Sequence, residues 1–174
     1  MTSAIRLAKD FYLRNAYTAA MEICGKILCV RQPDGTVLKR RITETECYLG
    51  EEDSACHAHR GKTGRTQTMY CEGGVAYVYL CYGIHDMLNI VTGQEGQPQA
   101  VLIRGVQGID GPGRLTRSMG ITRVMNGVSF TTSDILWLES DGYTPRLNRT
   151  PRIGISYASR EDQEKLWRFV DLEP

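Results

Sequence analysis

The sequence predicts a single-domain α+β fold over residues 1–174, in which short helices flank a mixed, mostly antiparallel sheet of hairpins. A chain of this length suits one domain with its own hydrophobic core. Its 18 glycines favour many turns. Short strand-like runs follow one another with turn residues between them, and strands joined in this way pair antiparallel.

The chain begins with a predicted helix and a first hairpin. Residues 9–24 carry apolar side chains at helical spacing, and Gly25 is a helix stop. Residues 26–30 and 37–49 are strand-like. The turn at 32–35 contains a proline that sets the bend and a glycine that accepts a positive φ. We therefore expect residues 26–49 to form a hairpin.

A loop and a second hairpin follow. Residues 51–65 are polar and contain glycine, which predicts a loop with one short helical turn before His57. Residues 75–81 and 87–92 are rich in β-branched and aromatic side chains and are typical of strands. The hairpin that they form carries Tyr82 at its tip.

The remaining chain adds one further strand, one short helix and three late strands. Residues 99–106 are strand-like, and Gly111-Pro112-Gly113 interrupts the chain before a helix at about 114–119. The late strands are expected at residues 135–139, 152–157 and 167–170.

Composition excludes several classes of protein. The net charge of +1 does not indicate a nucleic-acid binder on its own, but residues 60–65 and 114–117 form basic islands that either contact phosphates or are solvated loop charges. The six cysteines include no CxxC pair, which favours free thiols in a reducing cytosol. No run is long and apolar enough to span a membrane, and the N-terminus lacks the apolar core of a signal peptide.

The most informative segment is the run from residue 42 to residue 50. Because strand side chains alternate, Ile42, Glu44, Glu46 and Tyr48 are expected to share one face. A carboxylate beside a flat ring suits a pocket that binds a planar substrate and activates a water. The alternative is an ordinary half-exposed strand with solvated glutamates.

The second hairpin carries a cluster of tyrosines. Tyr82 at the tip has the chemistry of a wedge that separates stacked bases, unless its ring folds back on its own strand. Tyr77 and Tyr79 share a strand face that either lines an aromatic pocket or packs on the core.

A metal site is a weaker hypothesis. His57 and His59 are spaced to supply two ligands, and nearby carboxylates are available for a third, but this spacing is unspecific. The sequence contains no nucleophile elbow, Walker loop or dinucleotide fingerprint. These residues therefore do not predict a metal site, and no motif here indicates a cofactor.

Several motifs together resemble one family, the alkyladenine (3-methylpurine) DNA glycosylases of base-excision repair. They occur in the family's order through nearly the whole chain. The matching stretches are Ile42–Gly50 with His57, Gly74–Asn89 (containing VAYVYLCYGIHDMLN), Ala100–Arg104, Gly111–Leu115 with Met119–Ile121, Arg152–Ile155, and Trp167–Phe169.

The resemblance implies a monofunctional enzyme that flips a damaged purine out of double-stranded DNA and hydrolyses its N-glycosidic bond. Glu46 matches the catalytic glutamate that activates the water, and Arg104 matches the arginine that helps to hold that water. Residues that match the base pocket are Tyr48, His57, Tyr79, Asn89 and Leu102, and Tyr82 matches the intercalating tyrosine. Expected DNA backbone contacts are Arg65, Gly111, Gly113 and Arg114.

The chain departs from the family's pattern in places. It is short between Arg104 and Gly111, Thr66 replaces a usual asparagine, His85 replaces a position that is often aromatic, and residues 159–166 differ. The short segment motivates an alternative, a relative that binds distorted DNA without cutting it. We expect a monomer that acts in the cytoplasm or nucleoid, or in the nucleus if the source has one.

Overall fold

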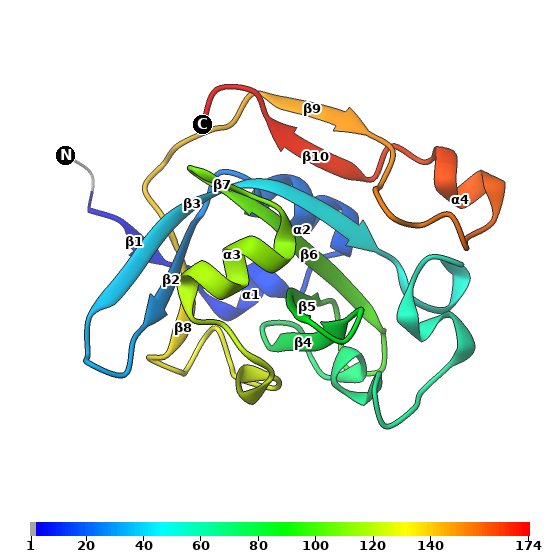
Figure 1. The fold of residues 1–174 in the computed structure, drawn as a ribbon, viewed down its shortest axis with the longest axis horizontal. Helices are drawn as coiled ribbons and strands as arrows, with labels where there is room; N and C mark the ends of the chain where they lie inside the picture. Colours follow the sequence, from blue (N-terminus) through cyan, green and yellow to red (C-terminus); the bar gives the residue numbers. More distant parts are fainter. Residues whose placement is uncertain (1–2) are drawn as a thin grey trace.

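The computed structural model describes residues 3–174 and joins ten strands into one sheet (Figure 1). The strands are β1 (Ile5–Arg6), β2 (Ile27–Arg31), β3 (Val37–Tyr48), β4 (Ala76–Cys81), β5 (His85–Thr92), β6 (Gln99–Val106), β7 (Ile109–Asp110), β8 (Leu136–Ser140), β9 (Leu147–Thr150) and β10 (Arg168–Asp171). The α-helices are α1 (Lys9–Tyr12), α2 (Ala16–Ile23), α3 (Pro112–Met119) and α4 (Arg160–Glu164). Short 3-10 helices are η1 (Gly50–Glu52), η2 (His57–Arg60), η3 (Gln67–Tyr70) and η4 (Arg123–Met125).

The main path of the sheet runs in the order β1-β8-β2-β3-β6-β5-β4, while β10 pairs with β3 and β9, and β7 pairs with β6. All of these pairings are antiparallel. The α+β prediction is confirmed, and so are the two hairpins, β2–β3 and β4–β5. Within residues 3–174, no helix combines the length and apolar character needed to cross a membrane.

Strand β3 is the element that connects the two halves of the sheet. Its first half pairs with β2, and its second half lies between β6 and β10. The register with β6 shifts between Ile42 and Thr45, which marks a bulge. The bulge interrupts the alternation that the sequence predicts. Ile42 joins the hydrophobic core together with Cys47 and does not share the face of Glu44.

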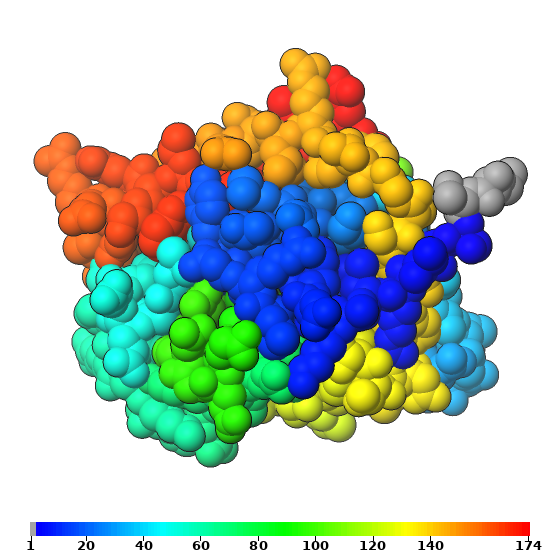
Figure 2. Space-filling model, turned by 180° about the vertical axis from the view of Figure 1, so that it is seen from behind, coloured from blue at the N-terminus to red at the C-terminus, as the bar shows by residue number. Residues whose placement is uncertain are grey.

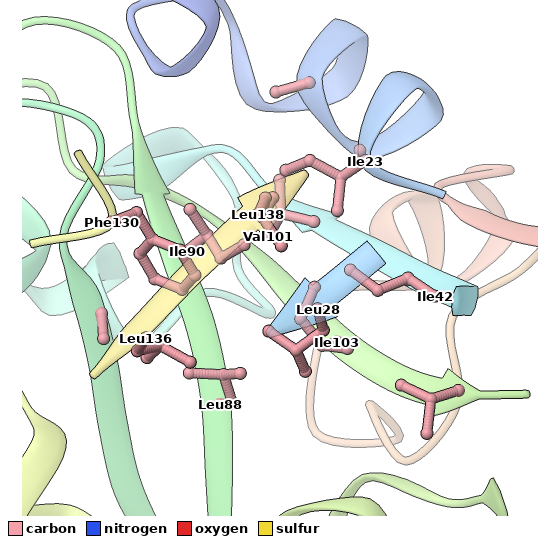
Figure 3. Close-up of a cluster of buried hydrophobic side chains, with 14 of the residues drawn as sticks. Ile23, Leu28, Ile42, Leu88, Ile90, Val101, Ile103, Phe130, Leu136 and Leu138 are labelled. Atoms are coloured by element: carbon pink, nitrogen blue, oxygen red, sulfur yellow. The ribbon is translucent and has the colours of Figure 1, made fainter. Parts of the chain in front are cut away.

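The core fills the space around the sheet. Figure 3 labels ten of its side chains, and all of these are fully buried. They come from α2, from β2, β3, β5, β6 and β8, and from the loop before β8. In Figure 1, α3 lies in front of the sheet and α2 behind it, and Figure 2 shows α1 and α2 covering the middle of the reverse face.

Two predicted elements need correction. The helix expected at 9–24 is divided into α1 and α2, because the Asn15 side chain accepts the Tyr17 N–H and starts a new helix. The strand expected at 152–157 is a loop, and β9 lies before it instead. The N–H of Ile153 in that loop is bound by a side chain, and Gly154 has a φ of +75°, so the segment does not continue a ladder.

Candidate active site

The carboxylate of Glu46 lies at the centre of the candidate site. Glu46 lies on β3, directly between Leu102 of β6 and Arg168 of β10, and it is fully buried. Its Oε1 accepts the backbone N–H of Ile153 at 2.7 Å, and its Oε2 accepts the hydroxyl of Tyr48 at 2.8 Å. These donors offset the loss of hydration that burial of a carboxylate imposes.

The protonation of Glu46 reflects two opposing effects. Burial raises its pKa above the usual value, while the charge of Arg104 and the two hydrogen bonds from Ile153 and Tyr48 lower it. The pKa of Tyr48 is itself raised well above its ordinary value by burial and by Glu46, so its hydroxyl keeps the proton that it donates. A buried carboxylate with a raised pKa has the properties of a general base.

Arg104 lies between two carboxylates. Its Nε donates to Oε1 of Glu44 at 2.9 Å and is 3.6 Å from Oε1 of Glu46. Arg168 binds the same oxygen of Glu44 through its own Nε. Glu44 therefore pairs with two guanidinium groups beside Glu46.

Aromatic side chains form a pocket beside this cluster. A small cavity of about 30 Å³ is lined by Tyr48, His57, Tyr77, Tyr79, Asn89 and Tyr157, together with small or apolar residues. The rings of Tyr77 and Tyr79 lie 5.4 Å apart, and the His57 ring stands edge-on 4.5 Å from Tyr79. Tyr77 and Tyr79 thus line the cavity, and Tyr77 also packs in a buried hydrophobic cluster, so both interpretations of this strand face apply.

A groove of about 640 Å³ adjoins the pocket and shares four lining side chains with it. The groove therefore has the volume that the small pocket lacks. The predicted residues that line the groove or the pocket are Tyr48, His57, Arg65, Tyr79, Tyr82, Asn89, Leu102 and Arg104. Segments far apart in the sequence thus meet around one opening.

Three of the expected DNA contacts lie outside this lining. Gly113 is buried, and a Cβ there would approach the His85 ring to 2.8 Å, so the missing side chain makes room for the ring. Arg114 is exposed on α3, and Gly111 is half-buried just before it. Their roles toward DNA stay predictions.

His57 is held in its neutral form. Burial and the nearby charge of Arg65 lower its pKa from 6.5 to about 4, and its Nδ1 forms a hydrogen bond of 3.1 Å with the hydroxyl of Tyr77. His59 contacts the backbone oxygen of Glu51 instead. Within residues 3–174 no three side chains of metal-binding type gather into a site, so the metal hypothesis for these histidines lacks a third ligand.

Asn89 is fixed by the neighbouring strand. Its Nδ2 donates to the backbone oxygen of Tyr77 at 3.2 Å, and the residue is 4% exposed. On β6, Leu102 lies directly opposite both Asn89 and Glu46. The pairing of β5, β6 and β3 thus places Asn89, which lines the pocket, and Leu102, which lines the groove, in register with Glu46.

Tyr82 is the most exposed part of the site. Tyr82 is 85% exposed. Its φ is 51°, and within residues 3–174 it is the one residue other than glycine with a positive φ. The N–H of Ile84 donates to the oxygen of Cys81, which closes a turn around Tyr82 and Gly83. Hairpin turns with two positive φ values favour Asn and Gly, so a tyrosine here stores strain.

Sequence reasoning missed a buried ion pair that organises the site. Arg152 and Asp53 form two hydrogen bonds of 2.6 and 2.9 Å, with side chains that are 0% and 1% exposed. Arg152 also donates to the oxygen of Cys47, and its guanidinium lies 4.8 Å from the centre of the Tyr48 ring. Because Ile153 follows Arg152 directly, the pair also fixes the N–H that binds Glu46. No local motif marks this contact, since 98 residues separate its partners.

Tyr157 was also missed as a pocket residue. It lines both the pocket and the groove, is 65% exposed, and donates its hydroxyl to the oxygen of Ala55 at 2.6 Å. The sequence placed it on a strand, where its contact with the pocket was not foreseen.

The Asp53→Asn variant is expected to lose about 3–5 kcal/mol of unfolding free energy, because Arg152 keeps a buried charge without its partner. Urea denaturation measures this loss. The matched control is Asp141→Asn, which breaks the more exposed pair with Arg41 and should cost about 1 kcal/mol or less. Equal losses in both variants would contradict a special role for the buried pair.

The ring of His57 is expected to titrate near pH 4 in NMR spectra of the folded protein. The unfolded chain binds this proton near pH 6.5, so the stability contributed by neutral His57 is present above pH 6.5 and declines as pH falls toward 4. The His57→Gln variant should therefore lose less stability than the parent over this interval. Titration of the ring near pH 6.5 would rule out this environment.

Comparisons with known proteins identify the family of this chain. The sequence model of the family described as methylpurine-DNA glycosylase (MPG) matches residues 10–111 and 108–173. Relatives from Psychrobacter cryohalolentis and Methanocella arvoryzae are each 40% identical, over 92% and 95% of this chain and 89% and 92% of their own lengths. A relative from Sodalis glossinidius is 39% identical over 99% of this chain and its own full length.

All three relatives carry the name "Putative 3-methyladenine DNA glycosylase". The family model covers almost the whole chain, and the three relatives align with 92%, 95% and 99% of it. The chain belongs to the methylpurine-DNA glycosylase family.

Proposed function

We propose that the protein is a monofunctional DNA glycosylase that releases alkylated or deaminated purines and leaves an abasic site. The substrate class comprises 3-methyladenine, 7-methylguanine, hypoxanthine and ethenoadenine in double-stranded DNA. The observation that carries the proposal is the buried carboxylate of Glu46, with its raised pKa, beside an aromatic pocket that opens to a groove.

In this proposal Glu46 acts as the general base. The water that it deprotonates attacks C1′ of the flipped nucleotide, and the carboxylate also stabilises the positive charge that develops on the sugar as the glycosidic bond breaks. Arg104, which lines the groove, helps to hold the water. No lysine lines the pocket or the groove, so the proposal includes no imine step.

The uncharged walls of the pocket support a preference for planar and cationic bases. His57 is neutral near pH 7, and burial raises the pKa of Tyr77 to about 12, so its hydroxyl stays protonated. Electron-rich ring faces attract a cation, whereas an imidazolium would repel it. Tyr48 is proposed to stack on one side of the base and His57 with Tyr79 on the other, while Asn89 and Leu102 limit the base at the floor.

The exposed hairpin tip supports recognition of the duplex. Tyr82 is proposed to fill the gap that the flipped nucleotide leaves, because base–aromatic stacking is comparable to the energy of unstacking. Arg65, Gly111, Gly113 and Arg114 are proposed to contact phosphates on either side. The protein would act as a monomer in the compartment that holds the DNA, which is the cytoplasm or nucleoid of a prokaryote.

The Glu46→Gln variant is expected to lose about 10²–10⁴-fold in the single-turnover rate of base excision, because an amide does not accept the proton of water. The assay uses a duplex carrying one hypoxanthine, with alkali to cleave the abasic product and a chelator present throughout. The amide oxygen still accepts the Ile153 N–H, so the melting temperature should change little. An unchanged rate would remove Glu46 as the base, and a parent protein that binds the duplex without product would favour the non-catalytic alternative.

The Tyr82→Ala variant is expected to bind a damaged duplex more weakly by about 1–3 kcal/mol, the range for loss of one stacking contact. Fluorescence anisotropy with duplex and single-stranded oligonucleotides measures the difference. Val124→Ala, which truncates a 90% exposed side chain outside the groove, is the matched control. Equal weakening for duplex and single strand would argue against a wedge.

A further inference from the structure

The guanidinium of Arg104 is shared unequally by two carboxylates. Its Nε is 2.9 Å from Glu44 and 3.6 Å from Glu46, and the side chains of Arg104 and Glu44 are 14% and 13% exposed. The hydrogen bond goes to Glu44 alone. The closer partner of Arg104 is therefore the carboxylate that has no role in the reaction proposed above.

We propose that Glu44 is a positioning residue for Arg104 and Glu46. By holding Nε of Arg104, Glu44 keeps that atom 3.6 Å from Oε1 of Glu46, a long ion pair without a hydrogen bond. It also leaves the terminal amino groups of Arg104, which make no hydrogen bond within residues 3–174, free to act in the groove that Arg104 lines. The inference rests on the proposed function, because it describes how the base of that reaction stays basic.

Glu44 is itself fixed from the opposite strand. Arg168 on β10 donates to Oε1 of Glu44 through Nε and to Oγ1 of Thr150 through Nη1 at 2.9 Å. The bulge in β3 lies at Glu44, which faces Gly105 across the pair with β6. These contacts anchor the carboxylate independently of Arg104.

Gly105 provides the space that Glu44 needs. A Cβ at this position would lie 3.3 Å from Cβ of Glu44, 3.5 Å from its Oε2 and 3.0 Å from Oγ1 of Thr43. The first and third distances are tighter than most side-chain contacts, and Gly105 is on a strand, where glycine is otherwise unfavourable. A glycine here thus allows β3 and β6 to approach closely around the Glu44 carboxylate.

Removal of the Glu44 charge changes the environment of Glu46 in a defined direction. Charged and titratable groups around Glu46 are Glu44 and Tyr48 on β3, Arg104 on β6, Arg168 on β10, and Arg152 with its partner Asp53. Without Glu44, Arg104 is released to approach Glu46. An opposite charge at closer range favours the ionised carboxylate, so Glu46 becomes a weaker base.

The test is the pH dependence of single-turnover excision from a duplex carrying 7-methylguanine, whose cationic base leaves without further protonation. Excision by a general base is lost as pH falls through the pKa of that base. The acidic limb is the part of the pH–rate profile in which the excision rate falls with falling pH. In the Glu44→Gln variant this limb should move to lower pH by about one unit or more. The maximal rate should also fall by up to about 10²-fold, because Arg104 is misplaced.

Two further variants separate positioning from folding. Glu44→Asp keeps the charge but retracts the carboxylate from Arg104, so its limb should move in the same direction by a smaller amount; it decides the question if Glu44→Gln does not fold. Glu139→Gln removes another buried, hydrogen-bonded carboxylate, paired with Lys39 outside the groove, and should leave the limb in place.

The outcomes distinguish this inference from the proposed function. A parent protein without excision activity overturns the proposed function and the inference with it. An active parent with variants that keep its acidic limb overturns the inference alone, whether or not their rates fall, because a purely structural loss lowers the rate without moving the limb. The inference is supported if the acidic limb moves to lower pH in Glu44→Asp and further in Glu44→Gln, relative to the parent protein.

Discussion

The buried ion pair between Arg152 and Asp53 is the contact on which the geometry of the site depends. Asp53 also accepts the N–H groups of Leu49 and Ala55, which fixes the chain as it leaves β3. Arg152 binds the backbone next to Glu46 and lies against one face of Tyr48. A single pair therefore determines where the carboxylate, its ring neighbour and its backbone donor lie relative to one another. Both charges lose their hydration when such a pair is buried, and its oriented hydrogen bonds offset that desolvation penalty.

The site as a whole combines burial with balanced charge. Burial raises the pKa of Glu46, while hydrogen bonds from the Ile153 N–H and the Tyr48 hydroxyl and the charge of Arg104 favour its ionised form. His57 experiences the reverse effect, since desolvation and a neighbouring cation keep it uncharged. The Glu46 carboxylate thus lies beside a pocket that is lined by uncharged rings, an arrangement that suits the leaving group of the proposed reaction, which carries or acquires positive charge.

Local signals in the sequence predicted those features that depend on near neighbours. The two hairpins follow from turn residues between alternating runs, and the proximity of Glu46 and Tyr48 follows from a period of two. Resemblance added Arg104, Asn89 and Leu102, which local patterns do not mark. The bulge between Ile42 and Thr45, the division of the first helix at Asn15 and the loop at 152–157 were not foreseen, because each depends on partners from distant segments or on a side chain that replaces a backbone hydrogen bond. The pair of Arg152 and Asp53 is of the same kind.

The left-handed conformation of Tyr82 has a consequence for the evolution of the protein. A residue other than glycine or asparagine in this conformation costs roughly 1–2 kcal/mol, and Tyr82 lacks the packing that would compensate, since its ring is exposed. Laboratory selection for heat resistance alone would therefore favour glycine or asparagine at this position. A chain improved in that way would gain stability at the hairpin tip and lose the ring that we propose as the wedge in DNA, so thermostability and the proposed recognition of damage would be in conflict at a single residue.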